Sequence, residues 1–229
     1  MNKKERQIFL HDKLVMMKAY EDSLRKTGAV YIAGVDEVGR GPLAGPVCAA
    51  AVILPHDFYV LGVDDSKKIT EKKREQLYDE ILNHALAWGV GSVGNRRIDE
   101  VNILNATKEA MLIAIEEAQR MLSGIAFGRE LPRGQRQNAL RIDHLLIDAV
   151  ELPDAKIPFT AITKGDEKSV SIAAASIIAK VTRDRMMVQF DAIYPGYAFA
   201  SNKGYGTTAH YEGLNRLGVT PIHRRSFLK

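Results

Sequence analysis

Short apolar runs along the chain predict the strands of one sheet. They end at glycine, proline or charged residues, which are typical of turns. The first three runs lie at 30–37, 47–54 and 86–94, and the last two lie at 144–150 and 158–166. Because consecutive strands tend to pair, the first three predict an antiparallel meander. Since helical segments come before the later runs, we expect those strands to join the sheet in parallel.

Helical periodicity predicts the layers that cover this sheet. Residues 169–191 are rich in Ala and Ser, whose small side chains allow a helix to approach a sheet closely. A glycine loop after residue 203 leads into a short final helix. We therefore expect an α/β fold with a mixed five-stranded sheet flanked by helices and a small helical C-terminal extension. The other predicted helices span 3–26, 70–84 and 98–122.

The composition is that of a globular protein without a membrane segment. Of the 229 residues, 46% are hydrophobic, which is enough for a core. The longest apolar runs, such as 47–54, are too short to span a bilayer. The charged N-terminus lacks the apolar stretch of a secretory signal, so we expect a cytoplasmic protein. The single cysteine, Cys48, lies in an apolar run, which predicts a core residue and excludes a cysteine metal site.

Basic residues are concentrated in three segments, although the formal net charge is only +4. Residues 1–28 hold seven Lys and Arg against four Asp and Glu, and residues 124–141 hold four Arg against one Glu. The last fifteen residues hold four basic side chains and no acid. Such clusters suit a polyanionic partner, but a solvated basic surface has the same pattern. Charge alone does not separate these two alternatives.

Four carboxylates stand where buried strands do not tolerate charge without compensation. Asp148 lies inside an apolar run, and the other three, Asp36, Glu37 and Asp166, end predicted strands. A charge beside buried apolar residues is costly unless it is paired or bound to a metal. If the sheet brings these four groups together, their repulsion favours a divalent cation or a shared proton.

Carboxylate oxygens of this kind suit Mg²⁺ or Mn²⁺ rather than zinc. The six histidines are scattered and form no competing motif. Two such ions about 4 Å apart can activate a water and stabilise the leaving oxygen in phosphodiester hydrolysis. Each acid taken alone can equally cap a turn or pair with a nearby Lys or Arg. The four together favour the metal site, although spacing in the sequence does not prove that they meet.

A glycine loop follows the first two acids directly. Gly39, Arg40 and Gly41 can bring the backbone close to a ligand and present its N–H groups. The loop lacks the GxxxxGK[ST] pattern, which excludes a P-loop. Beside two acids it suggests a reader of a sugar or a phosphate, with a plain tight turn as the alternative. Tyr205, set between two glycines, can stack on a sugar or a base, or can belong to the core.

Seven segments of the chain resemble, in order, the ribonuclease HII family, the bacterial type 2 ribonucleases H. The resemblance covers about residues 29 to 227, and its motifs are specific because chance does not supply seven in order. The segments are AGVDEVGRGPLAGPV, DDSKKIT, NILNATKEAM, HLLIDAV, TKGDEKSVSIAAASIIAKVTRDR, NKGYGTTAH and PIHRRSF.

The resemblance implies a ribonuclease H-like fold, with an N-terminal helical extension at 1–28 and a catalytic domain at 29–229. It also implies an acidic tetrad that holds two Mg²⁺ or Mn²⁺ ions. Asp184, in the TRD motif, is the alternative fourth acid. It ranks below Asp166, because Asp166 ends a predicted strand whereas Asp184 follows a long helix. The implied tetrad is Asp36, Glu37, Asp148 and Asp166.

The resemblance further implies how a substrate is bound. The backbone of Gly39, Arg40 and Gly41 would read the ribose 2′-hydroxyl at an RNA–DNA junction. Tyr205 would pack against the deoxyribose on the 3′ side, and Lys67 would lie near the scissile phosphate. Contacts to the DNA strand are implied for Asn105 and Thr107.

The implied function is that of a metal-dependent endoribonuclease. Its substrates would be the RNA strand of RNA–DNA hybrids and duplex DNA containing ribonucleotides, as met in ribonucleotide excision repair and DNA replication. Cleavage on the 5′ side of the ribonucleotide, by in-line attack of an activated water, would leave 3′-hydroxyl and 5′-phosphate ends. Little sequence selectivity is expected, because sugar and backbone are read rather than base edges. We expect a monomer.

Three alternatives stay open. Ribonuclease HIII shares the acids, but it carries a large N-terminal domain and lacks a matched junction reader. A non-catalytic binder of RNA–DNA hybrids would keep a basic surface but has no reason to keep four acids. An unrelated two-metal nuclease would cut an all-DNA duplex. Residues 1–28 and the arginine-rich segment 124–138 depart from the common family pattern, which leaves substrate grip and partner binding undetermined.

Overall fold

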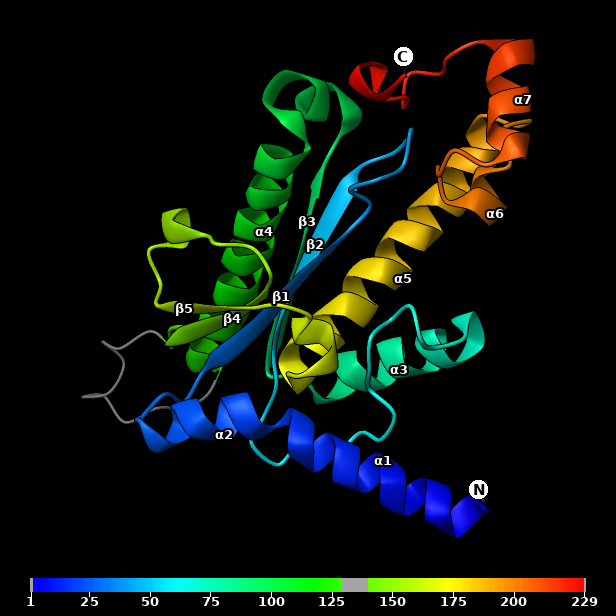
Figure 1. Ribbon diagram of the computed structural model, residues 1–229. Helices are drawn as coiled ribbons and strands as arrows, with labels where there is room; N and C mark the ends of the chain where they lie inside the picture. The colour runs from blue at the N-terminus through cyan, green and yellow to red at the C-terminus, as the bar shows by residue number, and fades with distance from the viewer. Residues whose placement is uncertain (1, 129–139, 229) are drawn as a thin grey trace.

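The computed structural model describes residues 2–128 and 140–228, and Figure 1 shows their arrangement. The arginine-rich segment of the sequence lies mostly outside the described residues. Three short 3₁₀ helices are η1 (Pro153–Ala155), η2 (Gly165–Glu167) and η3 (Arg225–Phe227). The strands are β1 (Ile32–Val38), β2 (Val47–Ile53), β3 (Ala87–Val93), β4 (His144–Asp148) and β5 (Phe159–Ile162). The helices are α1 (Lys3–Met17), α2 (Ala19–Lys26), α3 (Glu71–His84), α4 (Asn95–Gly128), α5 (Val170–Ile193), α6 (Phe199–Asn202) and α7 (Thr208–Leu217).

The five strands form one mixed sheet in the order β3-β2-β1-β4-β5. β2 pairs antiparallel with both β1 and β3. β4 pairs parallel with both β1 and β5. The predicted meander with two parallel additions is therefore confirmed. A parallel neighbour requires the chain to return to the same end of the sheet. The helix α4 returns it before β4, and the connection at 149–158, which contains only the 3₁₀ helix η1, returns it before β5.

Helices cover both faces of the sheet, with α4 on one side and α5 and α3 on the other (Figure 1). Alternate side chains of β2 point to opposite faces, as the pleat of a strand requires. Ala49 and Ala51 lie in the core cluster that includes α4, whereas Ala50 and Val52 lie in the cluster that includes α5 and α3. Because β2 is covered on both sides, its sequence is a continuous apolar run.

The close contact between α5 and β1 depends on a glycine. A Cβ atom built on Gly34 would lie 2.0 Å from the carbonyl carbon of Ser171. The backbone of α5 therefore rests directly on the strand that carries the first two acids. This contact confirms the predicted close packing of the small-residue helix on the sheet.

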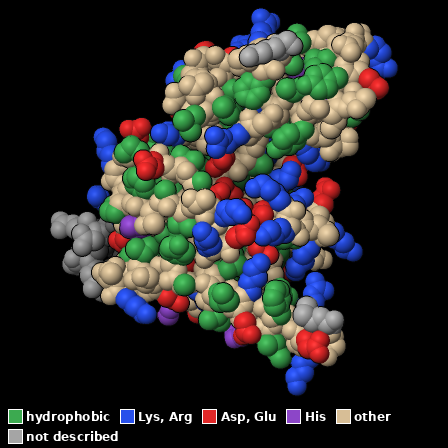
Figure 2. Space-filling model, viewed as in Figure 1, with side chains coloured by type: hydrophobic (Ala, Val, Ile, Leu, Met, Phe, Trp, Pro, Cys, Tyr) green, Lys and Arg blue, Asp and Glu red, His purple; other side chains and the backbone are tan. Residues whose placement is uncertain are grey.

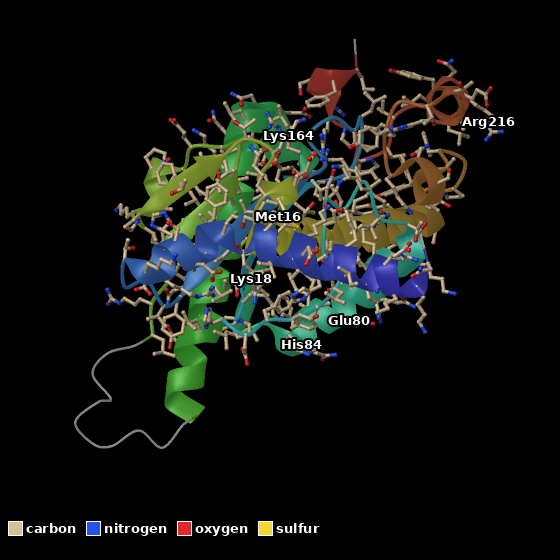
Figure 3. The ribbon with its side chains drawn as sticks, turned by 60° about the horizontal axis from the view of Figure 1, so that its bottom comes forward. Met16, Lys18, Glu80, His84, Lys164 and Arg216 are labelled. Atoms are coloured by element: carbon tan, nitrogen blue, oxygen red, sulfur yellow. The ribbon has the colours of Figure 1, made fainter. Side chains whose placement is uncertain are left out.

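The N-terminal residues form two helices rather than the single helix predicted over 3–26. Lys18 separates α1 from α2 (Figure 3). Leu14 and Met17 of α1 are buried in the cluster that includes α5. Glu21 of α2 is also buried and accepts hydrogen bonds from Ser171 N–H and from the Ser169 and Ser171 hydroxyls. Both helices are therefore packed on the elements around α5.

The long helix α4 is kinked near its start. Asn102 has φ 70° and ψ 166°, far from helical values, and its side-chain oxygen accepts a hydrogen bond from the Asn105 N–H at 3.1 Å. Asn102 thus caps the part of α4 that follows it. The sequence predicted a helix from 98 to 122, and it did not reveal this interruption.

Within the described residues, no helix is both long enough and apolar enough to cross a membrane.

We expect Gly34→Ala to destabilise the protein by about 3 kcal/mol, because backbone atoms of α5 cannot move aside for a methyl group. Urea unfolding followed by circular dichroism would measure the loss. Gly124→Ala is the matched control, since nothing lies within 4 Å of a Cβ at this exposed position of α4. The control should gain about 0.5–1 kcal/mol from helix propensity. Equal stability of the two variants would contradict the proposed contact.

Candidate active site

The parallel pairing of β1 and β4 brings two carboxylates side by side. Val35 pairs with Ile147, so the next residues, Asp36 and Asp148, stand at the same level on neighbouring strands. Both follow residues that face α4, and they therefore point to the face covered by α5. Asp36 is buried, with 4% of its surface exposed, and Asp148 is half-buried.

Asp166 reaches the same place from a different element. The sequence predicted that it ends the last strand, but β5 stops at Ile162 and Asp166 lies in η2. A left-handed residue, Lys164 with φ 54°, turns the chain there. The Gly165 N–H then donates to Asp148 Oδ1 at 2.7 Å, which ties η2 to β4. As a result, carboxylate oxygens of Asp36, Asp148 and Asp166 all lie within 4.8 Å of one another.

Glu37 stands next to this group but outside it. Its Oε1 lies 3.4 Å from Arg40 Nη1, at the end of β1. Its other oxygen, Oε2, is buried and has no hydrogen-bond partner among the described residues. The Asp148 charge contributes to raising the Glu37 pKa, so the two side chains interact electrically.

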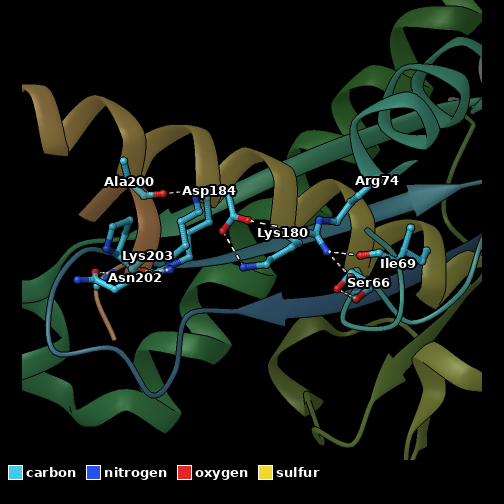
Figure 4. Close-up of polar contacts among 12 residues, drawn as sticks. Ser66, Ile69, Arg74, Lys180, Asp184, Ala200, Asn202 and Lys203 are labelled. Atoms are coloured by element: carbon cyan, nitrogen blue, oxygen red, sulfur yellow. Dashed lines mark hydrogen bonds and ion pairs between the residues drawn. The ribbon is translucent and has the colours of Figure 1, made fainter. Parts of the chain in front are cut away.

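Asp184 does not join the three acids. It lies two turns further along α5 than Ser176 and forms ion pairs with Lys180 Nζ at 2.7 Å and with Arg74 Nη2 at 3.9 Å (Figure 4). These two cations neutralise it. The structure thus brings Asp166 rather than Asp184 to the other two acids, although Asp166 does not end a strand as expected.

Burial and mutual repulsion shift the acids toward their protonated forms. Burial, and then the charges of Glu37 and Asp148, raise the pKa of Asp36 well above its ordinary value, despite an opposing hydrogen bond from Ser176. Burial and the charges of Asp65 and Asp148 raise the pKa of Asp166 to about 6. Burial is also the main cause of the raised Glu37 pKa. An anionic cluster of this kind is relieved by a bound cation.

Sequence reasoning missed Asp65, which belongs to the same electrostatic group. Asp65 is buried, accepts the Lys67 N–H at 2.9 Å, and raises the pKa of Asp166. Lys67 itself extends over the acids, with Nζ 3.8 Å from Asp166 Oδ2 and a side chain that is 78% exposed. Partial burial works to lower the Lys67 pKa, but the surrounding carboxylates raise it overall. The two adjacent acids in the segment DDSKK were the available signal.

The residues present fit a divalent metal ion. Three oxygen donors converge from three elements, and an unpartnered buried oxygen of Glu37 lies beside them. Oxygen donors at this spacing are what Mg²⁺ and Mn²⁺ prefer. Of the described residues, the histidines take no part in this group. The space-filling view shows acidic side chains in the middle of one face, among Lys and Arg side chains (Figure 2).

The glycine loop lies at the end of β1, beside the acids. Gly39 has φ +91°, a conformation that favours glycine, and a Cβ there would lie 2.2 Å from Arg183 Nε. The chain around the loop is tied to the C-terminal part of the protein, because the Leu43 N–H donates to the Gly204 carbonyl and Ala44 forms a bridge with His223. The loop is therefore fixed from several sides.

Tyr205 lies against this loop. A Cβ on Gly41 would be 3.5 Å from Tyr205 Cε1, and 44% of the tyrosine is exposed. Two buried histidines support it: His210 Nδ1 lies 2.9 Å from the Tyr205 carbonyl oxygen, and His210 Nε2 lies 3.0 Å from His223 Nε2. The Thr220 N–H donates to His223 Nδ1, which fixes every proton in this chain of neutral rings. Burial lowers the pKa of both histidines, that of His223 to about 4, so both rings are neutral at pH 7.

Asn105 and Thr107 have different surroundings. Asn105 is exposed in the part of α4 that follows the kink. Thr107 is fully buried, and its hydroxyl donates to the Ile103 carbonyl at 2.7 Å. The expected contact of the Thr107 side chain with DNA is therefore not met in this structure. Helical periodicity carried the relevant signal, since Ala110 and Met111, three and four residues after Thr107, are both buried.

Comparison with known proteins gives a consistent result. The model of the family described as ribonuclease HII matches residues 33–229. A ribonuclease HII of Bacillus mycoides is 51% identical over 224 residues, which is 98% of this chain and 77% of the relative. Among solved structures, ribonuclease H2 from Pyrococcus horikoshii OT3 has a TM-score of 0.63 at 25% identity, covering 86% of this chain and 93% of that one. Bst-RNase HIII in complex with Mn²⁺ has a TM-score of 0.62 at 19% identity, covering 89% and 69%, and supports the fold alone.

We expect Asp36→Asn to stabilise the protein in the absence of divalent ions by about 1–2 kcal/mol. The folded pKa of Asp36 lies above its ordinary value of 3.8, so stability is lost as the pH rises through the folded pKa, and the amide removes that loss. Thermal unfolding in EDTA and in Mg²⁺ or Mn²⁺ at pH 7 would measure it. The wild type should gain stability from the ion and the variant should gain less.

Asp184→Asn is the control for this experiment. Because Asp184 is neutralised by Lys180 and Arg74, its loss should lower stability and leave the gain from the ion intact. A gain from the ion that survives Asp36→Asn unchanged would contradict the metal centre.

Proposed function

The chain belongs to the ribonuclease HII family, and we propose that it hydrolyses the RNA strand of RNA–DNA hybrids and cuts on the 5′ side of ribonucleotides embedded in duplex DNA. Membership makes it a nuclease of a hydrolase family. The observation that carries the proposal is the convergence of Asp36, Asp148 and Asp166 within 4.8 Å, beside a fixed glycine loop.

The four carboxylates of the proposed tetrad would form a metal site. Asp36, Glu37, Asp148 and Asp166 would together hold two Mg²⁺ or Mn²⁺ ions. The bound ions would supply Lewis-acid chemistry, which activates water and stabilises a developing negative charge on oxygen. Hydrolysis with inversion would leave a 3′-hydroxyl and a 5′-phosphate. The buried, unpartnered oxygen of Glu37 supports its inclusion, since burial without a partner is costly.

The surrounding residues would orient the scissile phosphate. The Lys67 ammonium, exposed and 3.8 Å from Asp166, can contact a non-bridging phosphate oxygen. The Gly165 N–H keeps Asp148 in one orientation. The Glu37 N–H does the same for Asp36, since it donates to Asp36 Oδ1 at 2.7 Å. These backbone N–H groups therefore fix the orientation of the acids. The positive charge of Lys67 reduces the electrostatic repulsion between the acids and an approaching polyanion.

Recognition of the ribonucleotide would come from the glycine loop and Tyr205. The backbone of Gly39, Arg40 and Gly41 can both donate to and accept from a 2′-hydroxyl, which DNA lacks. Tyr205, half-exposed beside Gly41, would pack against the next deoxyribose. Base edges are not read in this arrangement, so selectivity for sequence would be small.

We also propose that the protein acts as a monomer in the cytoplasm, in the removal of ribonucleotides from DNA and in replication. Asn105, exposed beyond the kink of α4, is retained as a contact to the DNA strand. Residues 1–28 would be an extension of the catalytic domain at 29–229, held to it by Glu21.

Replacement of Asp36 or Asp148 by Asn should reduce kcat on a duplex with one ribonucleotide by about 1,000-fold, which corresponds to about 4 kcal/mol. The reason is that each substitution removes one of the carboxylates that would bind the metal ions. Steady-state cleavage in Mg²⁺ and in Mn²⁺ would measure it. Asp184→Asn should retain most activity, because Asp184 is a buried acid that lies outside the group of Asp36, Asp148 and Asp166. Retention of most cleavage by both Asp36→Asn and Asp148→Asn would reject the tetrad.

Tyr205→Ala should lower kcat/KM for a single embedded ribonucleotide by about tenfold more than for an all-RNA strand in a hybrid. A long RNA strand offers many binding registers, whereas a single ribonucleotide depends on one junction contact. Stacking of this kind contributes about 1–3 kcal/mol. Tyr59→Ala, another exposed tyrosine, is the control and should change neither substrate. An all-DNA duplex should stay intact, and its cleavage would favour an unrelated nuclease.

A further inference from the structure

Arg224 lies fully buried behind the glycine loop and is not used in the function proposed above. Its guanidinium donates three hydrogen bonds to backbone carbonyl oxygens of the loop region. The distances are 2.6 Å from Nη2 to Gly39, 2.9 Å from Nη1 to Arg40 and 2.9 Å from Nε to Gly45. The planar fork of a guanidinium matches three fixed acceptors, which an ammonium cannot do.

A second buried arginine supports the neighbouring chain. Arg183 of α5 donates to the carbonyls of Pro46 and Ala44, at 2.9 and 3.2 Å, and to that of Lys203 at 2.9 Å. Arg183 thus joins the loop to the segment that leads to Tyr205. Arg224 alone contacts the carbonyls within the motif Gly39–Gly41.

The bonds of Arg224 determine where two N–H groups of the motif point. In a trans peptide the carbonyl and the N–H of the same unit point in opposite directions, and the described residues contain no cis peptide. The Gly39 carbonyl shares its unit with the Arg40 N–H, and the Arg40 carbonyl with the Gly41 N–H. Because both carbonyls point inward to Arg224, both N–H groups point away from it.

The charge of Arg224 is as informative as its geometry. Among the described residues, all six hydrogen-bond acceptors of the two arginines are carbonyl oxygens, so no hydrogen-bonded carboxylate neutralises either one. Burial and the charge of Arg183 lower the pKa of Arg224 to about 9, which leaves it charged at pH 7. Burial of an uncompensated charge is costly. A polyanion bound at the loop would compensate it, and the positive charge would strengthen the N–H groups as donors.

Resting on the proposed function, we infer that Arg224 is a positioning residue for the discrimination of ribose from deoxyribose. It fixes the N–H groups of Arg40 and Gly41 toward the substrate, and its charge polarises their peptide units. The side chain itself does not touch the substrate. The C-terminal segment, which carries Arg224, therefore positions the loop that would recognise the ribose, although it does not itself contact the substrate.

The test compares binding of two duplexes that differ by one 2′-hydroxyl. Fluorescence anisotropy, with Ca²⁺ in place of Mg²⁺ and intact substrate verified on gels, gives the affinity ratio of a single-ribonucleotide duplex to an all-DNA duplex. We expect Arg224→Gln to lower this ratio about tenfold. Arg224→Lys, which keeps the charge but loses the fork, should fall between Arg224→Gln and the wild type.

Leu122→Ala is the control for stability, because Leu122 is buried in α4, in the core cluster on the face away from α5. It should lower the melting temperature and leave the ratio unchanged, as expected for a purely structural loss. If folded Arg224→Gln keeps the wild-type ratio within twofold, the inference is overturned while the proposed function stands. If wild-type protein neither prefers nor cuts the ribonucleotide duplex, the proposed function fails instead.

A measurement on the wild type covers the case in which neither variant folds. The Arg224 Nε–H resonance should exchange slowly with solvent, since the group is buried. It should shift together with the Arg40 and Gly41 amides when the single-ribonucleotide duplex is added, and less with all-DNA duplex. An Arg224 signal that responds equally to both duplexes would overturn the inference.

Discussion

The repulsion between buried like charges is the constraint on which the centre of this protein depends. The register of two parallel strands places Asp36 beside Asp148, and a turn after β5 adds Asp166. The neighbouring groups all act on this repulsion: Lys67 extends over the acids, the Gly165 N–H binds Asp148, and burial shifts the equilibrium toward protons or cations.

Much of the fold follows from the sequence because strands and helices leave strong periodic signals. The apolar run at 47–54 predicted a strand covered on both faces, and β2 is buried throughout. The order of runs and helices predicted which strands pair in parallel. The register of that pairing then places Asp36 and Asp148 at the same level and on the same face of the sheet. The sequence predicted the strands that carry these two acids, whereas their register came from the structure.

Other features depend on contacts between distant parts of the chain, which periodicity does not encode. Asp166 reaches the centre through a left-handed turn and a 3₁₀ helix, so its position could not be read from a strand pattern. Glu37 pairs with Arg40 and stays outside the group of three converging acids, although it is adjacent to Asp36 in sequence. Thr107 is buried, and Arg224 is buried too, against the ordinary preference of an arginine for solvent. In each case contacts between distant parts of the chain determined where the side chain lies.

The carboxylate of Glu21 joins the N-terminal part of the chain to the start of α5. It accepts the hydrogen bonds of Ser169 and Ser171 at the first turn of α5, three residues after Asp166. A chain trimmed to the family-matched residues 33–229 would lose Glu21 and leave those donors without their acceptor. The N-terminal helices therefore supply α5 with an anion, much as a bound ligand would. A version of the protein shortened for crystallisation or engineering would need another anion at the start of α5.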